Sequence, residues 1–387
     1  MTECIKRIVQ ENINDIVELR RLIHRYPELG GKEIETTKRL QAFFKSRGLT
    51  LHPIADLTGG YLFIDAKSNK TICFRADIDA LPIVEATGAL FTSESKGTMH
   101  ACGHDVHTAV AAGVALTLEK LKESLKCNVI VLFQPAEECN PIGGALPIIE
   151  TGFLRGNNIC EMYGLHVWPS YPVGEIALKT GALMGSSDRF VVEIHGKKSH
   201  AAEPHNGVDS ISIASEIINA LVHKIRRELN PFDVFLISIG SISSNGRYNI
   251  ICDNVKLEGT IRTVSEPVRD FVHKRICALS ESIAASYCGR ADVEIHRGYD
   301  VVQNDFKLTE SFVNFARMSL GNEKVHQLDE PSLIGEDFSR YSQEVPSLYF
   351  FMGCENDYPL HSDHFLPKEE VIQQGVELVA GYLLQRQ

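Results

Sequence analysis

The sequence predicts an α/β protein that carries a smaller α+β domain as an insertion, and two patterns in the chain lead to this prediction. Short apolar runs alternate with helical patterns up to about residue 185 and again after about residue 297. Such alternation is typical of strand-helix-strand units and a largely parallel sheet. The residues between hold four strand patterns and two long helical patterns, which favour helices packed on one face of an antiparallel sheet. We therefore expect one domain from residues 1–185 and 297–387, split by an inserted domain of residues 186–296.

Composition and charge restrict the class of protein. The chain of 387 residues is long for one hydrophobic core, and its 44% hydrophobic and 23% charged residues are typical of a globular enzyme. A net charge of −11 argues against a nucleic-acid or anionic-membrane surface, because such surfaces need clustered Lys and Arg. No apolar run approaches the roughly 20 residues of a membrane span. Ten irregularly spaced cysteines and an N-terminus without an apolar leader lead us to expect a cytoplasmic protein with free thiols.

The first elements form a scaffold that leads to a strand with two aspartates at its end. Helical spacing of apolar residues predicts helices over residues 12–27 and 36–46. A buried strand then begins at Thr71 and ends with Asp77 and Asp79 ahead of a proline. In an open α/β sheet, ligands bind beyond the carboxyl ends of the strands. The two aspartates are therefore placed to serve a site, with turn capping as the alternative.

Residues 98–107 are unusually dense in metal-binding atoms. They read Thr-Met-His-Ala-Cys-Gly-His-Asp-Val-His and lead into a helix predicted over residues 108–121. A thiolate and neutral imidazoles suit zinc or another late first-row divalent ion, and the spacing of Cys102 and His104 can place two donors on one ion. The alternative is that these residues only pack and cap the start of the helix.

Two further strands end in residues that suit metal-assisted hydrolysis. The apolar strand over residues 128–133 leads to Glu137 and Glu138, and the strand over residues 162–169 contains His166. Adjacent side chains point opposite ways on an extended chain, but in a loop one glutamate can hold a metal while the other holds the attacking water. Taken alone, such a glutamate pair could also be a solvated turn, and such a histidine a core residue.

The expected inserted domain contains one segment that is rich in histidine. Its predicted strands cover residues 189–195, 234–242, 255–262 and 291–296, and its predicted helices cover residues 209–226 and 266–286. Residues 196–207 lead into the first helix and include His200 and His205. This segment is too long for a simple turn, so it either contributes to a site or forms a polar surface loop.

The last part of the chain returns to alternating helices and strands. A helix is predicted over residues 307–319, and Glu336 and Asp337 are expected in the first turn of a short helix, where the helix dipole favours acids. A buried strand over residues 347–353 is followed by His361 and His364 and by a final helix.

Seven short strings, in order along the whole chain, resemble the M20 metallopeptidase superfamily. The similarity is greatest to its amidohydrolase branch, which includes hippurate hydrolases, indole-acetyl-amino-acid hydrolases and N-acyl-amino-acid deacylases. The strings are RADIDALP (residues 75–82), HACGHD (100–105), FQPAEE (133–138), GLH (164–166), SHAA (199–202), GEDF (335–338) and LHS (360–362).

The resemblance implies a zinc-exopeptidase-like catalytic domain with a mixed, parallel-centred sheet, and an inserted domain of four strands and two helices that forms a homodimer in many relatives. It also implies a site for two divalent ions per subunit, which could be Zn, Mn, Co or Ni. Their ligands would be Cys102, His104, Glu138, His166 and His361. Glu137 would be the general base that deprotonates the attacking water and later protonates the leaving amine.

The resemblance also assigns residues of the inserted domain. His200 would stabilise the tetrahedral oxyanion, often from the partner subunit, and Asn249 and Arg262 would bind the α-carboxylate of the substrate. Asn254 competes with Asn249, because the loop lacks the proline found in many relatives. Asp77 is interpreted as support for a ligand, since this branch has Arg-Ala-Asp in place of the His-x-Asp ligand motif. His107, His364 and His205 would either support the site or only pack.

The function implied is hydrolysis of the amide bond of an N-acyl amino acid to a carboxylate and a free amino acid. The partners expected are this substrate or a dipeptide and further copies of the chain as a homodimer or higher oligomer, with no nucleic acid and no membrane. Three alternatives remain: a dipeptidase or carboxypeptidase, an enzyme in which Cys102 is a nucleophile with a histidine base, and a metal-stabilised binding protein without turnover.

Overall fold

The computed structural model describes residues 2–386, and the chain divides into two compact units. Unit 1 contains the residues up to Leu183 together with 302–330 and 337–387, and unit 2 contains residues 184–301 and 331–336. The chain therefore returns to unit 2 for six residues before it completes unit 1. None of the described helices is long and apolar enough to cross a membrane.

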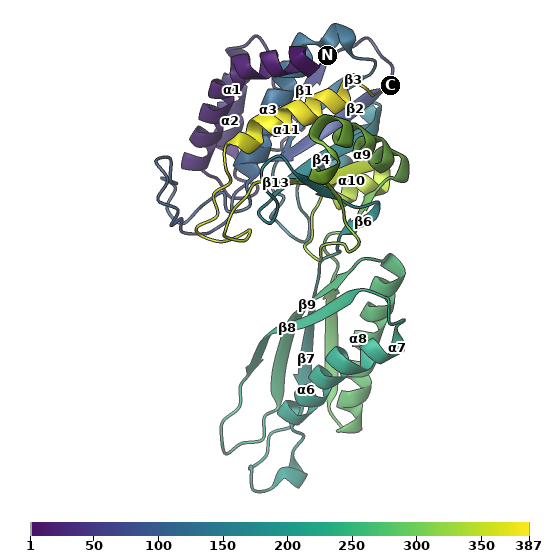
Figure 1. Ribbon diagram of the computed structural model, residues 1–387. Coiled ribbons are helices and arrows are strands. Elements are labelled where there is room, and N and C mark those ends of the chain that lie inside the picture. The colour runs from purple at the N-terminus through teal and green to yellow at the C-terminus, as the bar shows by residue number, and fades with distance from the viewer. Residues whose placement is uncertain (1, 387) are drawn as a thin grey trace. The chain divides into compact units, whose positions relative to one another are not determined.

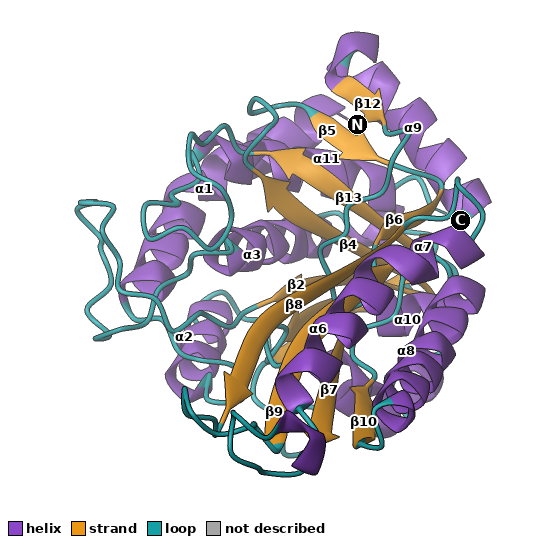
Figure 2. Cartoon of the chain, turned by 90° about the horizontal axis from the view of Figure 1, so that it is seen from below, coloured by secondary structure: helices purple, strands orange, loops and turns teal. Residues whose placement is uncertain are grey.

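Unit 1 is built on a seven-stranded sheet in the order β1-β3-β2-β4-β13-β5-β12. Its strands are β1 Gly60–Ile64, β2 Thr71–Asp77, β3 Asn128–Gln134, β4 Ile159–Trp168, β5 Ile176–Leu178, β12 Val325–Gln327 and β13 Ser347–Gly353. The four central strands are parallel, whereas β1 pairs antiparallel with β3 and β5 pairs antiparallel with β13. The predicted mixed, parallel-centred sheet is therefore confirmed. Figure 2 shows β2, β4, β13 and β5 side by side.

Continuous burial explains why the central strands are apolar along their whole length. Every residue of β2, β3 and β13 is buried, as expected for strands covered on both faces by helices. The helices are α1 Thr2–Arg25, α2 Ile34–Lys45, α3 His104–Lys120, α4 Ala145–Glu150, α5 Phe153–Gly156, α9 Phe306–Leu320, α10 Ser339–Glu344 and α11 Glu370–Leu383. Helices α1, α3 and α11 pack against one another, and Figure 1 shows α11 beside α1 and α3. A short separate pair is formed by β6 Gly181–Met184 and β11 Val302–Asn304.

Unit 2 is a four-stranded antiparallel sheet in the order β10-β7-β9-β8, with helices on one face. Its strands are β7 Asp188–His195, β8 Phe235–Ser244, β9 Asn254–Thr263 and β10 Arg290–His296. Helix α6 Ser210–Asn219 continues through a π-helical turn, Ala220–Lys224, into α7 Ile225–Glu228, and α8 spans Glu266–Ser286. Apolar residues of both helices and of the inner sheet face form one core, so the predicted α+β architecture is confirmed.

Three predicted helix starts were wrong. Helix α1 spans Thr2–Arg25 rather than starting at residue 12, because the buried Ile5, Ile8 and Val9 extend its apolar face toward the N-terminus. Helix α3 begins at His104 rather than residue 108, because Gly103 adopts a left-handed conformation (φ 87°) that starts the helix earlier. The residues from His104 to Leu118 are all buried, so the amphipathic pattern that would mark the first turn is absent. Helix α10 begins at Ser339, after the two acids, and Asp337 instead accepts a hydrogen bond from Arg75 at 2.6 Å.

A buried charge cluster holds together the segments by which the chain enters and leaves unit 2. Asp188, the first residue of β7, accepts hydrogen bonds from Arg269 (2.5 and 2.8 Å) and from His273 Nε2 (2.7 Å). It also accepts from the main-chain N–H of Gly298 at 2.9 Å. Burial by itself would raise the pKa of the Asp188 carboxyl, but the hydrogen bonds from Arg269 and His273 lower this pKa well below its ordinary value.

We expect the Asp188 carboxylate to make the stability of unit 2 decrease as the pH is lowered. A depressed folded-state pKa gives stability that is present above the unfolded pKa of about 4 and is lost as the pH falls below it. Asp188→Asn should lower the free energy of unfolding at pH 7 by about 3–5 kcal/mol, because it leaves Arg269 buried without its main counter-ion. Urea unfolding of both proteins at pH 7 and at lower pH measures this effect, and the difference between them should shrink in acid.

The matched control is Asp292→Asn, which changes a half-exposed aspartate on β10. We expect it to change the free energy of unfolding by less than about 0.5 kcal/mol. Equal stability of Asp188→Asn and the unchanged protein at pH 7 would show that the cluster does not stabilise the unit.

Candidate metal centre

The metal-binding side chains of unit 1 come from four segments that meet at the carboxyl ends of the parallel strands. Cys102 and His104 lie at the start of α3, and Glu138 follows β3. His166 lies near the end of β4, and His361 follows β13. This edge of the sheet is where ligands bind in open α/β folds.

The structure brings all five predicted ligands together. Cys102 Sγ lies 3.3 Å from His166 Nε2, and His361 Nε2 lies 3.3 Å from Glu138 Oε1. Donor atoms within 4.8 Å of one another form the groups Cys102–His104–His166, Cys102–Glu138–His361 and His104–Glu137–Glu138. Two ligands of one ion, each about 2.0–2.3 Å from it, lie at most about 4.6 Å apart. The first two groups share Cys102, so this arrangement fits two adjacent ions.

Two buried atoms in the cluster support the same interpretation. His104 Nε2 and Glu138 Oε1 are buried and make no hydrogen bond to any part of the chain that the structure describes. A buried polar atom without a partner costs about 1–3 kcal/mol. A divalent cation between them would satisfy both atoms, so the residues present fit a metal centre.

Backbone conformation helps to aim these side chains. A Cβ atom at Gly103 would lie 2.4 Å from Val167 Cγ2, so only glycine lets α3 start this close to β4. Ala136 (φ 58°) and His361 (φ 67°) adopt the left-handed region, which is costly for residues other than glycine and is concentrated at functional sites. The N–H of Ala136 donates to Glu33 Oε1 at 2.7 Å, which fixes the turn that precedes the paired glutamates.

Asp79 supports the imidazole of a predicted ligand. His104 Nδ1 lies 3.0 Å from the main-chain oxygen of Asp79 and 3.2 Å from its Oδ1. Asp79 Oδ2 also accepts from the N–H of Glu138 at 2.9 Å. Asp79 therefore ties two predicted ligands to the end of β2, as carboxylates commonly do around metal centres. Asp77 accepts from Arg75 (2.7 Å) and His107 (2.6 Å), and its Oδ2 lies 3.7 Å from His104 Nε2.

Glu137 lies beside the donor atoms in a buried position. Its side chain is 6% exposed, and its Oε1 lies 3.4 Å from the main-chain N–H of Asp337. It shares a group of close donor atoms with His104 and Glu138. Asp337 is fixed in turn by hydrogen bonds from Gln134 Nε2 (2.8 Å) and from the N–H of Gly144 (2.8 Å). A carboxylate held in this way next to a metal centre is suited to move a proton.

The surroundings of Cys102 disfavour a nucleophilic thiolate. Burial raises the pKa of the Cys102 thiol, and the nearby carboxylates of Glu138 and Glu137 raise it further. Burial also lowers the pKa of His166 well below its ordinary value. A cysteine nucleophile needs a thiolate paired with an imidazolium. Here the raised thiol pKa disfavours the thiolate, and the lowered imidazole pKa disfavours the imidazolium.

The predicted site residues of unit 2 lie at two opposite ends of its sheet. His200 forms a β-bridge with Ile250, and the N–H of Ala201 donates to the carbonyl of Asn249 at 3.2 Å, so His200 and Asn249 are neighbours. Arg262 lies at the other end of β9. Since a strand rises about 3.3 Å per residue, roughly 25 Å of sheet separates the two ends.

The remaining candidates have other partners or lie on the surface. The amide nitrogen of Asn254 lies 3.5 Å from His195 Nδ1. His364 is exposed and stacks on Tyr358 with a centroid distance of 4.9 Å, and His205 is exposed in a short 3₁₀ turn.

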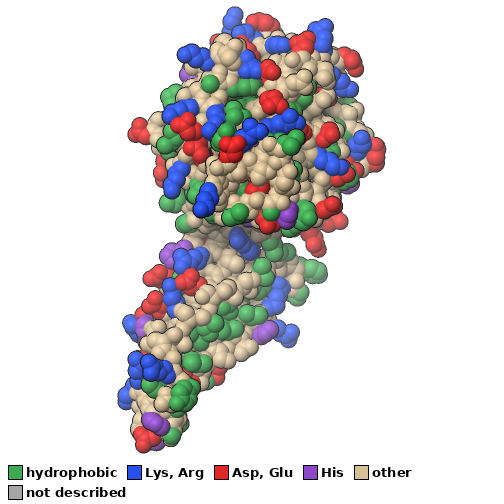
Figure 3. Space-filling model, turned by 90° about the vertical axis from the view of Figure 1, so that its left-hand side faces the viewer, with side chains coloured by type: hydrophobic (Ala, Val, Ile, Leu, Met, Phe, Trp, Pro, Cys, Tyr) green, Lys and Arg blue, Asp and Glu red, His purple; other side chains and the backbone are tan. Residues whose placement is uncertain are grey.

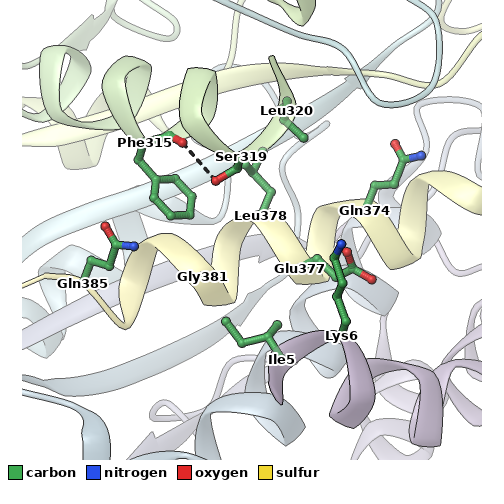
Figure 4. Close-up of a pocket in the computed structure, with 10 residues that line it drawn as sticks. All are labelled: Ile5, Lys6, Phe315, Ser319, Leu320, Gln374, Glu377, Leu378, Gly381 and Gln385. Carbon is green, nitrogen blue, oxygen red and sulfur yellow. Dashed lines mark hydrogen bonds between the residues drawn. The ribbon is translucent and has the colours of Figure 1, made fainter. Parts of the chain in front are cut away.

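A separate pocket of about 120 Å³ lies between α1, α9 and α11 (Figure 4). Ile5, Phe315 and Leu378 are among its apolar lining residues, and Lys6 and Glu377 add opposite charges. No predicted ligand lines this pocket, so it is distinct from the cluster of donor atoms.

Comparison with known proteins agrees with this geometry. Residues 73–385 match the model of peptidase family M20/M25/M40. The N-acetyl-L-cysteine deacetylase of Bacillus subtilis is 41% identical over 359 residues, which cover 92% of this chain and 84% of the relative. Thermostable carboxypeptidase 1 of Saccharolobus solfataricus is 36% identical over 383 residues, which cover 97% of this chain and 96% of the relative.

A solved structure is similar to this chain over almost its whole length. The crystal structure of a dinuclear metal-binding M20 peptidase from Bacillus subtilis matches with a TM-score of 0.84 and 32% identity, and the match covers 97% of this chain and 98% of that one. The family model and these whole-length similarities agree with the motifs and with the cluster of donor atoms. The chain therefore belongs to peptidase family M20/M25/M40.

Proposed function

We propose that this protein hydrolyses the amide bond of N-acyl amino acids, releasing a carboxylate and a free amino acid, with the help of two divalent metal ions. The observation that carries the proposal is the gathering of five donor side chains around a further buried carboxylate. Two of the five, His104 and Glu138, have a buried atom that makes no hydrogen bond within the described residues. The proposed metal ligands are Cys102, His104, Glu138, His166 and His361.

The chemistry divides between the ions and the chain. When bound, the ions would polarise the substrate carbonyl and make water a better nucleophile near neutral pH. Glu137 takes a proton from the attacking water and delivers it to the leaving nitrogen. Asp79 keeps the Nδ1 proton of His104 directed away from the donor cluster, so that Nε2 is free to act as a ligand.

Arg262 is the proposed partner of the substrate α-carboxylate. Its side chain is half-buried, and it makes no ion pair or hydrogen bond within the described residues 2–386. A guanidinium binds a carboxylate through two parallel hydrogen bonds, which orients the substrate as well as holding it. Burial lowers the pKa of Arg262, and a substrate carboxylate would offset this cost.

Two copies of the chain would be needed to complete the site. His200 and Asn249 lie roughly 25 Å of strand away from Arg262 within the rigid sheet of unit 2, which is longer than an N-acyl amino acid. His200 and Arg262 of a single chain therefore cannot contact one substrate. We infer that His200 acts in the site of a partner subunit, where it would stabilise the oxyanion.

An edge strand supports this homodimer. Strand β8 is the edge of the sheet of unit 2 and offers a row of unpaired main-chain groups to a second chain. Leu236 is 42% exposed and Ile242 is 58% exposed on this strand, and Phe232 just before it is 92% exposed. Figure 3 shows hydrophobic side chains gathered on the face of unit 2 that is turned to the viewer.

The donor set restricts which metals can bind, and the state of the cysteines indicates the compartment. One thiolate and three imidazoles favour Zn, Co or Ni, whereas the glutamate also allows Mn. All ten cysteines are free thiols, which fits a reducing compartment such as the cytoplasm.

A second candidate function is cleavage of a peptide bond. One of the similar proteins is a carboxypeptidase, and the same metal centre can hydrolyse either amide. The group that occupies the acyl side of the substrate decides between the two activities.

Release of free amine from a substrate panel tests the proposal. The panel contains N-acetyl, N-benzoyl and indole-acetyl amino acids and dipeptides, and the protein is stripped with a chelator and assayed with and without Zn²⁺, Mn²⁺, Co²⁺ or Ni²⁺. We expect no release without metal and metal-restored release from N-acyl amino acids. Release from dipeptides alone would favour the peptidase, and no release despite bound metal would contradict the proposal.

A further inference from the structure

His107 lies one helical turn after His104 in α3, and both of its ring nitrogens are engaged. Nδ1 lies 2.6 Å from Asp77 Oδ1, and Nε2 lies 2.9 Å from the main-chain nitrogen of Val167. A main-chain N–H can only donate, so Nε2 accepts and carries no proton. The ring proton is therefore on Nδ1 and is donated to Asp77. Neither nitrogen is left to bind a metal.

The ring of His107 fills a gap between two strands. The parallel pairing of β2 with β4 ends at Arg75 and Gly164, before either strand reaches its last residue. Beyond this point, the N–H of Val167 donates to the His107 ring. The imidazole therefore takes the place of a strand residue, and it joins the end of β2 to the end of β4 through Asp77.

This bridge acts on the proposed metal ligand His166. His166 Nδ1 lies 2.7 Å from the carbonyl of Val167, so the residue whose N–H is held by His107 also holds the His166 ring. The His107 ring packs against the His166 ring edge to face, with centroids 4.6 Å apart, and lies 5.4 Å from the His104 ring. His166 Nε2 is thereby directed at Cys102 Sγ.

The other end of the bridge is rigidly anchored. Asp77 accepts from Arg75 at 2.7 Å, and Arg75 also donates to Asp337 (2.6 Å) and to Gln134 (2.9 Å). The side chains of Arg75, Asp77 and Asp337 are fully buried, and that of His107 is 1% exposed. Hydrogen bonds therefore link Arg75, Asp77 and His107 to the main-chain N–H of Val167, and the carbonyl of the same residue contacts the proposed ligand His166.

We propose that His107 is a positioning residue that sets the metal affinity of the site by fixing His166 through the main chain of Val167. The inference rests on the proposed metal centre, but it concerns a residue that cannot itself bind the ion. Supports of this kind typically change metal affinity by about 10- to 100-fold when they are removed.

The experiment compares His107→Met with His107→Gln. Methionine removes both hydrogen bonds, whereas the glutamine amide can accept from Val167 N–H with its oxygen and donate to Asp77 with its nitrogen. Stripped protein is titrated with Co²⁺ against a competing chelator, and the thiolate-to-cobalt absorption of Cys102 reports binding without any measure of activity. Thermal unfolding of each stripped variant shows whether the fold is retained. The control is His326→Met, which changes a histidine of β12 that is hydrogen-bonded to Glu175 at 2.6 Å.

We expect His107→Met to weaken Co²⁺ binding by about 10- to 100-fold, and His107→Gln and His326→Met to stay within about threefold of the unchanged protein. If His107→Met does not fold when stripped, His107→Asn replaces it, since asparagine is too short to reach both partners. Unchanged binding by the folded Met or Asn variant, or equal loss in the Gln variant, would overturn the inference. Failure of the unchanged protein to bind Co²⁺ would instead overturn the proposed metal centre.

Discussion

Glu137→Gln is expected to lower kcat for N-acyl amino acid hydrolysis by about 10²- to 10⁴-fold while leaving metal binding unchanged. Glutamine keeps the size and hydrogen-bonding capacity of the side chain but cannot accept and return a proton. The proposed metal ligands are other residues, and Glu138 is the glutamate that lies next to His361 (3.3 Å). The expected result is therefore a folded, metal-loaded protein with very little turnover.

Metal content and steady-state rates measured on the same preparation test this prediction. Glu150→Gln is the matched control, since Glu150 is an exposed residue at the end of α4, and its kcat should equal that of the unchanged protein. Turnover of Glu137→Gln near the control value would remove Glu137 from its proposed role. If Glu137→Gln loses both its bound metal and its turnover, Glu137 is a metal ligand instead.

His200→Ala is expected to lower kcat by about 10²-fold or more, because it removes the proposed donor to the oxyanion. The control in unit 2 is His296→Ala, which changes an exposed histidine of β10 that should not affect the rate. The metal content of His200→Ala should be unchanged, since His200 belongs to a different unit from the donor cluster.

Mixed dimers distinguish a site completed by the partner subunit from one completed within a single chain. Chains with different affinity tags are co-expressed, and dimers that carry both tags are purified. If His200 acts across the dimer, Glu137→Gln paired with His200→Ala should have about half of the normal activity, because one of its two sites is complete. A chain with both substitutions, paired with an unchanged chain, should then be nearly inactive. The reverse pattern, or a purely monomeric protein with full activity, would contradict the trans arrangement.

The architecture and the family follow largely from local patterns. The apolar runs that became β2, β3 and β13 are short and fully buried, and the inserted domain has the predicted strands and helices. Short strands such as β5 and β12 were not predicted, because three residues carry too little periodicity. The start of helix α3 was predicted too late because the helix is buried on all sides. Its first turn therefore lacks the alternation of polar and apolar faces that marks a helix in the sequence.

The sequence by itself identified the candidate ligands and the candidate base, through the order of short motifs that resembles the family and the donor atoms that those motifs contain. Only the tertiary structure decided which residues support them. Asp79 contacts His104 Nδ1, and His107 joins Asp77 to the main-chain N–H of Val167. These contacts link residues that are 25 to 60 positions apart in the chain. They depend on which strands are neighbours and where their pairing ends, and no local pattern of residues encodes that register.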